Sequence, residues 1–239
     1  LMLWLDANET STMDTGASSG AGGVPNNSET VGYWGDRSGN GNFAAAYQAA
    51  ANRKPTYIAT GFNGSLPTLQ FDGSLNIMEV QNPAAFDTWD EMSVFIVSEG
   101  NSLNNWKTLI GKNGEDGQGW QLHRRDGDNR TRLTFRGTIG ADDRDFAYEL
   151  NDANLVSLVY GDGLRRFFGD GSQKDSITDS GAISAAPNSP LSIGGRVRDA
   201  GQRQSYAKSM ISEVIVFKST LADDERQKIE GYLAHKWGL

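Results

Sequence analysis

Hydrophobic positions dominate one short stretch near the end of the chain. From Ile211 to Phe217 nearly every residue is apolar, a pattern typical of a strand that is buried on both faces. Glu213 is the exception, and a carboxylate in such a strand needs a partner if it is buried. The pattern therefore predicts a central strand that carries one paired acid.

A helix is predicted directly after this strand. Acidic residues crowd positions 223–225, where the helix dipole favours negative charge, and Thr220 is expected to cap the helix. Gly238 is expected to close its end. The apolar positions that recur at helical spacing are Leu221, Ile229, Tyr232, Leu233 and Trp237. The strand and this amphipathic helix form the seam against which the rest of the chain must pack.

The same stretch carries a family resemblance. The run SEVIVF at 212–217 and the run LADDERQKIEGYLAHKWGL at 221–239 resemble the end of bacterial laminin-G-like domains of the concanavalin A-like superfamily. Two earlier motifs agree, WGDRSGNGN at 34–42 and LQFDG at 69–73. The resemblance implies an all-β fold, a two-sheet antiparallel jelly-roll sandwich with a C-terminal helix. It also implies one module of a larger bacterial protein that is secreted or displayed at the cell surface.

Composition agrees with one large β domain over residues 1–239. The chain has 29 glycines and only six prolines, which suits many short strands and turns. Its net charge of −8 disfavours general nucleic-acid binding, and the absence of any run of 18 apolar residues argues against membrane insertion. Because Leu1–Leu5 already reads as a strand, we expect a domain excised from a larger protein, with neighbouring modules as partners.

The glycine-rich motif at 34–42 allows two interpretations. Asp36, Asn40 and Asn42 supply oxygens of the kind that calcium prefers, so a structural calcium site is one prediction. The other is a turn in which Asp36 accepts hydrogen bonds from backbone amides. Trp34 is expected in the core.

A β-hairpin is predicted from Gly119–Arg125 and Arg130–Arg136, joined by the turn 126–129. Side chains alternate between the faces of a strand, so placing Leu122, Leu133 and Phe135 in the core fixes the other face. The residues expected on that solvent-exposed face are Gln121, His123, Arg125, Arg132, Thr134 and Arg136.

This predicted face is rich in arginine, with six arginines and no lysine between His123 and Arg144. Arginine matches carboxylate and sulfate oxygens in a bidentate manner. The alternative is that these arginines pair across the strands with nearby acids. The residues predicted to bind a ligand are Gln121, His123, Arg125, Arg132, Arg136, Tyr206 and Lys208.

Signatures of catalysis are few. The chain has no cysteine, no Gly-x-Ser-x-Gly and no phosphate loop, and it lacks the Glu-x-Asp-x-x-Glu strand of laminarinase-type hydrolases. No catalytic residue is therefore assigned. One alternative is open, because Gln121-Leu-His123, Arg132 or Arg136, and Tyr206-Ala-Lys208 are similar to the strands of jelly-roll alginate lyases.

The sequence thus favours a non-catalytic carbohydrate-binding module that recognises an acidic polysaccharide. One alternative is an adhesion or protein-interaction domain, and a second is a polysaccharide lyase acting on a uronate polymer.

Overall fold

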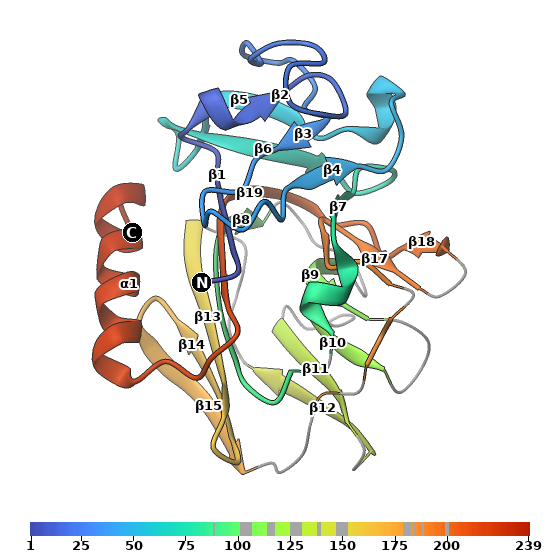
Figure 1. Ribbon diagram of the computed structural model, residues 1–239. Helices are drawn as coiled ribbons and strands as arrows, with labels where there is room; N and C mark the ends of the chain where they lie inside the picture. Colours follow the sequence, from blue (N-terminus) through green and yellow to red (C-terminus); the bar gives the residue numbers. More distant parts are fainter. Residues whose placement is uncertain are drawn as a thin grey trace.

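Two antiparallel sheets and one helix make up the fold (Figure 1). The computed structural model describes residues 1–87, 89–100, 107–113, 118–124, 131–137, 140–146, 153–178, 183, 185–187, 189–198 and 201–239. One sheet has eight strands, in the order β15-β14-β13-β8-β19-β6-β5, with β1 also paired to β19. The other has nine, in the order β12-β11-β10-β9-β16-β7-β4-β3-β2. The predicted two-sheet sandwich with a C-terminal helix is confirmed.

The eight-stranded sheet is built from β1 (Leu3–Asp6), β5 (Thr56–Phe62), β6 (Leu66–Asp72), β8 (Met92–Gly100), β13 (Ala153–Gly161), β14 (Leu164–Gly169), β15 (Ser172–Thr178) and β19 (Lys208–Phe217). The nine-stranded sheet is built from β2 (Met13–Asp14), β3 (Tyr33–Trp34), β4 (Ala44–Ala46), β7 (Met78–Val80), β9 (Lys107–Lys112), β10 (Gly119–Arg124), β11 (Thr131–Gly137), β12 (Gly140–Phe146) and β16 (Ser192–Ile193). A small hairpin joins β17 (Arg196–Val197) to β18 (Arg203–Gln204), and 3-10 turns cover Thr10–Thr12, Ala51–Arg53 and Pro83–Phe86.

The strand β19 lies in the middle of its sheet and is buried on both faces, as its composition predicts. Val214 and Val216 belong to the core between the two sheets. Ile215 packs instead into a second core, which the helix α1 (Asp223–Trp237) closes with Leu233 and Trp237. Figure 1 shows α1 lying along the outside of the eight-stranded sheet. The protein therefore has three layers, in the order helix, sheet, sheet.

Glu213 has the partners that its burial requires. Its side chain is fully buried and accepts hydrogen bonds from Trp237 Nε1 at 2.6 Å and Trp4 Nε1 at 2.7 Å. Lys236 Nζ lies 2.6 Å from Glu213 and 2.7 Å from Asp6, which also pairs with Arg37. This buried network joins the first strand of the chain to its last helix.

The beginning of α1 differs from the sequence prediction. The N-cap is Ala222, whose backbone N–H donates to the Glu225 carboxylate at 3.2 Å. Thr220 is not the cap, because its hydroxyl donates to the carbonyl of Tyr160 in β13 of the eight-stranded sheet. Tyr232 was expected on the buried stripe, yet it is 45% exposed. The helix therefore buries a narrower stripe than its spacing suggests.

The segment 43–54 has a helix-like composition, but it forms β4 and a short 3-10 turn. Ala44 pairs with Val80 and with Trp34, so tertiary strand pairing overrides the local helix propensity of alanine. Trp34 is fully buried, as expected. Within the described residues, no helix has the length and apolar character needed to cross a membrane.

Candidate functional site

The face of the nine-stranded sheet that is turned away from the core is called the outer face here. Met78, Val80, Ile110 and Leu122 point into the core, so the residues that alternate with them lie on the outer face. Residues directly opposite each other in a ladder share a face. One row therefore crosses the sheet from β2 to β10, through Asp14, Tyr33, Ala45, Glu79, Ser192, Gly111 and Gln121. At about 4.8 Å between strands the row is roughly 29 Å long.

An exposed aromatic ring stands on this face. Tyr47 follows β4 two residues after Ala45, and it is 39% exposed. The guanidinium carbon of Arg203 lies 3.2 Å from the centre of its ring, and Arg203 Nε donates to Glu79 Oε1 at 2.5 Å. A second hydrogen bond joins Arg203 to the carbonyl of Gly201. Arg203 is thus fixed by three contacts, and it holds the Tyr47 ring in one orientation.

Tyr206 lies close enough to Tyr47 and to two arginines for their charges to act on its phenol. The backbone of Tyr206 forms an isolated bridge to Thr108 of β9, and the backbone of Lys208 lies opposite Asp72 in the ladder between β19 and β6. Burial raises the pKa of the Tyr206 phenol, whereas the positive charges of Arg53 and Arg203 act in the opposite direction. Tyr206 therefore lies where the charges of Arg53 and Arg203 both act.

The acid within this region is already engaged by the backbone. Burial alone would raise the pKa of Asp72, but hydrogen bonds from the amides of residues 74–76 and from the Ser74 hydroxyl outweigh it and lower the pKa. Its carboxylate is held in its own turn by these bonds. The hydrogen-bonding capacity of Asp72 is therefore largely taken up within its own turn.

The structure describes the predicted Arg-rich face only in part. β10 and β11 pair in the expected register, with Gln121 opposite Thr134 and His123 opposite Arg132. However, Gln121 is 6% exposed and His123 is 1% exposed, so the expectation that they face solvent was wrong. Alternation along a strand distinguishes its two faces, but it does not show what covers each of them.

The arginines of that face are not described in full. Arg125 lies outside the described residues, and for Arg132 and Arg136 the structure describes the backbone register alone. Gln121 contacts Thr108, the residue that bridges to Tyr206, since Thr108 Oγ1 lies 3.4 Å from the side-chain oxygen of Gln121. Of the two residues that the lyase alternative offers for proton transfer, His123 is buried, whereas Tyr206 is only half-buried.

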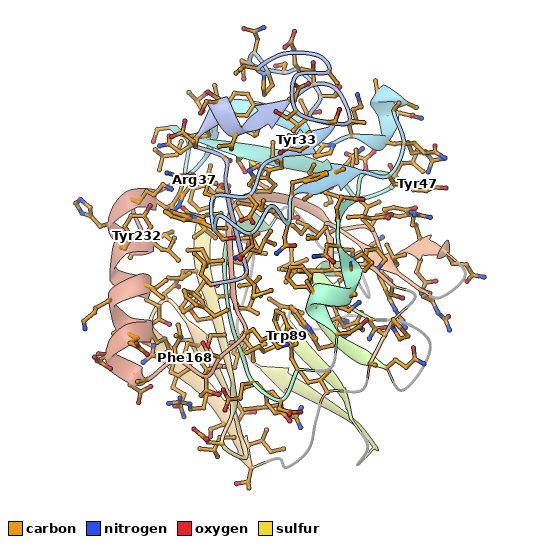
Figure 2. The ribbon with its side chains drawn as sticks, viewed as in Figure 1. Tyr33, Arg37, Tyr47, Trp89, Phe168 and Tyr232 are labelled. Atoms are coloured by element: carbon orange, nitrogen blue, oxygen red, sulfur yellow. The ribbon has the colours of Figure 1, made fainter. Side chains whose placement is uncertain are left out.

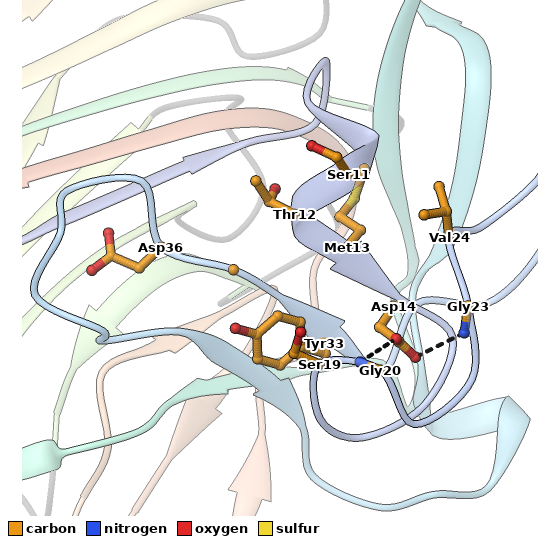
Figure 3. Close-up of a pocket in the computed structure, with 11 residues that line it drawn as sticks. Ser11, Thr12, Met13, Asp14, Ser19, Gly20, Gly23, Val24, Tyr33 and Asp36 are labelled. Atoms are coloured by element: carbon orange, nitrogen blue, oxygen red, sulfur yellow. Dashed lines mark hydrogen bonds between the residues drawn. The ribbon is translucent and has the colours of Figure 1, made fainter.

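A pocket of about 390 Å³ opens at the β2–β3 edge of the nine-stranded sheet (Figure 3). Ser11, Thr12, Ser19 and Tyr33 are among its lining residues. Asp14 accepts hydrogen bonds from the amides of residues 16, 20 and 23, at 2.6, 2.8 and 3.2 Å. Burial would raise the Asp14 pKa, but these amides lower it. One carboxylate thus organises the long glycine-rich loop that forms the wall of the pocket.

The predicted calcium residues form a capped turn. Both carboxylate oxygens of Asp36 accept hydrogen bonds, from the amides of Trp4, Ser38 and Asn42. Asn40 and Asn42 donate through their side chains to the carbonyls of Leu1 and Met2. The turn holds β1 in place, and calcium at this motif stays a prediction.

Comparison with known proteins identifies the family. A sequence profile of the concanavalin A-like lectin/glucanases superfamily matches residues 79–225, which is more than half of the chain. The chain belongs to this superfamily. No curated protein matches the sequence.

Solved structures share the fold of this concanavalin A-like domain at low sequence identity. Domain 4 of AbnA, a GH43 extracellular arabinanase from Geobacillus stearothermophilus in complex with arabinotriose, has a TM-score of 0.67 at 13% identity, covering 96% of this chain and 98% of that one. The botulinum neurotoxin serotype G binding domain has a TM-score of 0.63 at 15% identity, covering 98% and 51%. The Ruminococcus gnavus sialidase CBM40 bound to α2,3-sialyllactose has a TM-score of 0.56 at 16% identity, covering 68% and 95%. At these identities the likeness concerns the fold.

Proposed function

We propose that this domain is a non-catalytic carbohydrate-binding module, and that its polysaccharide ligand binds on the outer face beside Tyr47. The observation that carries the proposal is the Tyr47 ring, which is exposed at 39% and held by Arg203 at 3.2 Å. A fixed aromatic ring offers an apolar surface to a sugar ring without losing side-chain entropy on binding. Arg203 acts as a positioning residue, because its Nε is already bonded to Glu79.

The ligand is proposed to be anionic. Arg53 adds positive charge near Tyr206, and Lys208 follows Tyr206 by two residues in the chain, while the nearby acids Asp72 and Glu79 are held in hydrogen bonds. Carboxylate or sulfate groups of a polysaccharide would pair with these cations. One structural neighbour binds sialyllactose and another binds arabinotriose, which supports a sugar as the ligand class. We further propose that the domain is secreted or surface-displayed, next to other modules of its parent protein.

The direct test is Tyr47→Ala in a titration of the domain with uronate-containing and sulfated polysaccharides. Loss of the ring should weaken binding about tenfold, equivalent to about 1.4 kcal/mol. Tyr232→Ala is the matched control, because Tyr232 is a 45% exposed tyrosine on α1 (Figure 2 labels both side chains, on opposite sides of the view). Equal affinity in the two variants would refute the proposed site.

Charge is tested separately. Arg53→Ala combined with Lys208→Ala should reduce both the affinity and its dependence on salt, since screened ion pairs are lost. Arg132→Ala with Arg136→Ala extends the test to the predicted Arg-rich face. Salt-independent binding of neutral polysaccharides would refute the proposal that the ligand is anionic, but it would still support a carbohydrate-binding module. No binding to any glycan would favour the protein-interaction alternative, and ultraviolet absorbance from unsaturated products would favour the lyase.

A further inference from the structure

A second hollow, of about 370 Å³, lies between α1 and the turn that follows β14. Positions 227, 230, 231 and 234 of the helix line it, and these share one helix face. Leu155 forms an apolar part of the opposite wall, and Gly171 lies at the turn. The hollow is on the helix-covered side of the fold, so it is separate from the outer face. Its volume is within the range of small-molecule sites.

Glycine keeps this hollow open. Gly231 is in the interior of a 15-residue helix, where glycine is less favourable than alanine. A Cβ added at Gly231 would meet no atom within 4 Å, so close packing does not explain the glycine. A side chain larger than methyl at this position would project into the hollow.

A carboxylate with an unused oxygen forms part of the wall. The side chain of Glu230 is 5% exposed, and its Oε2 pairs with Arg226. Its Oε1 is buried and accepts no hydrogen bond from the residues that the structure describes. An unsatisfied buried acceptor is costly. A donor bound beside Glu230 would give this carboxylate the hydrogen bond that it lacks.

The polar side chains at the hollow favour a positively charged guest. Asp170 stands at the mouth, where its Oδ1 accepts a hydrogen bond from the Leu155 amide at 2.9 Å. Gln227 supplies an amide oxygen. Among the described lining residues there is no lysine, arginine or histidine. Two carboxylates beside an apolar wall suit a small cation that carries an alkyl body.

We propose that this hollow binds a primary alkylammonium group, with the ammonium between Asp170 and Glu230 and the alkyl chain against Leu155 and Ala234. Such a group occurs in polyamines and amino sugars, and both present the same chemistry to the site.

The test uses three probes of one size, namely butylammonium, butanol and butyrate. Each is titrated into the domain while the backbone amide signals of Gly171 and Gly231 are followed by NMR. Butylammonium should shift both signals saturably, with an affinity at least tenfold higher than that of butanol and with no saturation by butyrate. Butanol or butyrate binding as tightly as butylammonium would overturn the proposal.

Variants locate the binding. Gly231→Leu fills the hollow and should lower butylammonium affinity at least tenfold, whereas Gly231→Ala should retain it. Asp170→Asn should weaken binding about threefold or more, and Asp224→Asn, an exposed acid on the same helix, should change it less than twofold. Gln227→Glu adds a carboxylate and should tighten binding at least twofold, which keeps the test decisive if Gly231→Leu does not fold. Unchanged affinity in both Gly231→Leu and Gln227→Glu would refute the site.

Discussion

Lys236→Met removes a cation that bridges two buried carboxylates. Lys236 Nζ lies 2.7 Å from Asp6 and 2.6 Å from Glu213, whose side chains are 2% and 0% exposed. Methionine has a similar length and helix propensity, so the substitution acts mainly on charge. Arg37 still pairs with Asp6 in the variant, but among the described residues Glu213 is left with the indole donors of Trp4 and Trp237.

The expected loss of stability is large. Removing one partner of a buried ion pair costs about 3–5 kcal/mol, because it leaves a buried charge without compensation. For a domain of this size that corresponds to a fall in Tm on the order of 10 °C. Lys228→Met is the matched control, since Lys228 is a 75% exposed lysine of the same helix, paired with Asp224. Its midpoint should equal that of the wild type.

The loss should depend on pH in a defined way. Burial disfavours the charged form of Lys236, but its two carboxylate partners outweigh burial and raise its pKa above 10.5. The contribution of Lys236 to folding stability is therefore complete below pH 10.5, and it disappears as the pH rises through the pKa of the folded protein. Burial, and then the charge of Asp6, raise the pKa of Glu213 above 4.5, so its ionisation in the folded protein lowers stability as pH rises from 4.5. Without Lys236 this penalty grows. The difference between wild type and variant should therefore be largest near neutral pH and smaller at both extremes.

Urea denaturation at pH 4, 7 and 11 measures this difference. Lys236→Met combined with Glu213→Gln should recover much of the loss at pH 7, because the uncompensated charge is gone. A loss below about 1 kcal/mol at pH 7, or an equal loss at pH 4 and pH 7, would refute the reasoning that the buried pair holds β1 to α1.

Three further predictions concern other parts of the molecule. Trp237→Ala should destabilise the fold by roughly 2–5 kcal/mol, because the fully buried indole closes the helix-side core, and an unchanged unfolding midpoint would contradict this. Gly231→Ala should raise the free energy of unfolding by about 0.5–1 kcal/mol, since a helix-interior glycine with open space gains propensity without a clash; a lower Tm would contradict it. Calcium at Asp36, Asn40 and Asn42 predicts that a chelator lowers Tm by mass action, and identical curves with chelator and with millimolar calcium would leave only the capped turn.

Local sequence pattern was sufficient for the strands and the helix that form the centre of the fold. The apolar run 211–217 and the helical spacing after it identify β19 and α1, because burial on two faces leaves a strand almost no polar positions. The need of Glu213 for partners could also be read from the sequence, but not that Trp4, Trp237 and Lys236 supply them. Those contacts join residues that are far apart in the chain.

The candidate site depended on tertiary structure. The composition of 43–54 suggests a helix, so the alternation that puts Tyr47 on the outer face is apparent only once Ala45 pairs with Glu79. Arg203 reaches Tyr47 across more than half of the chain, from a hairpin that carries no motif. Conversely, the alternation in β10 gave the register of Gln121 and His123 but not their burial. Sequence periodicity thus determined which residues share a face, whereas the folding of distant segments decided which parts of that face stay open to a ligand.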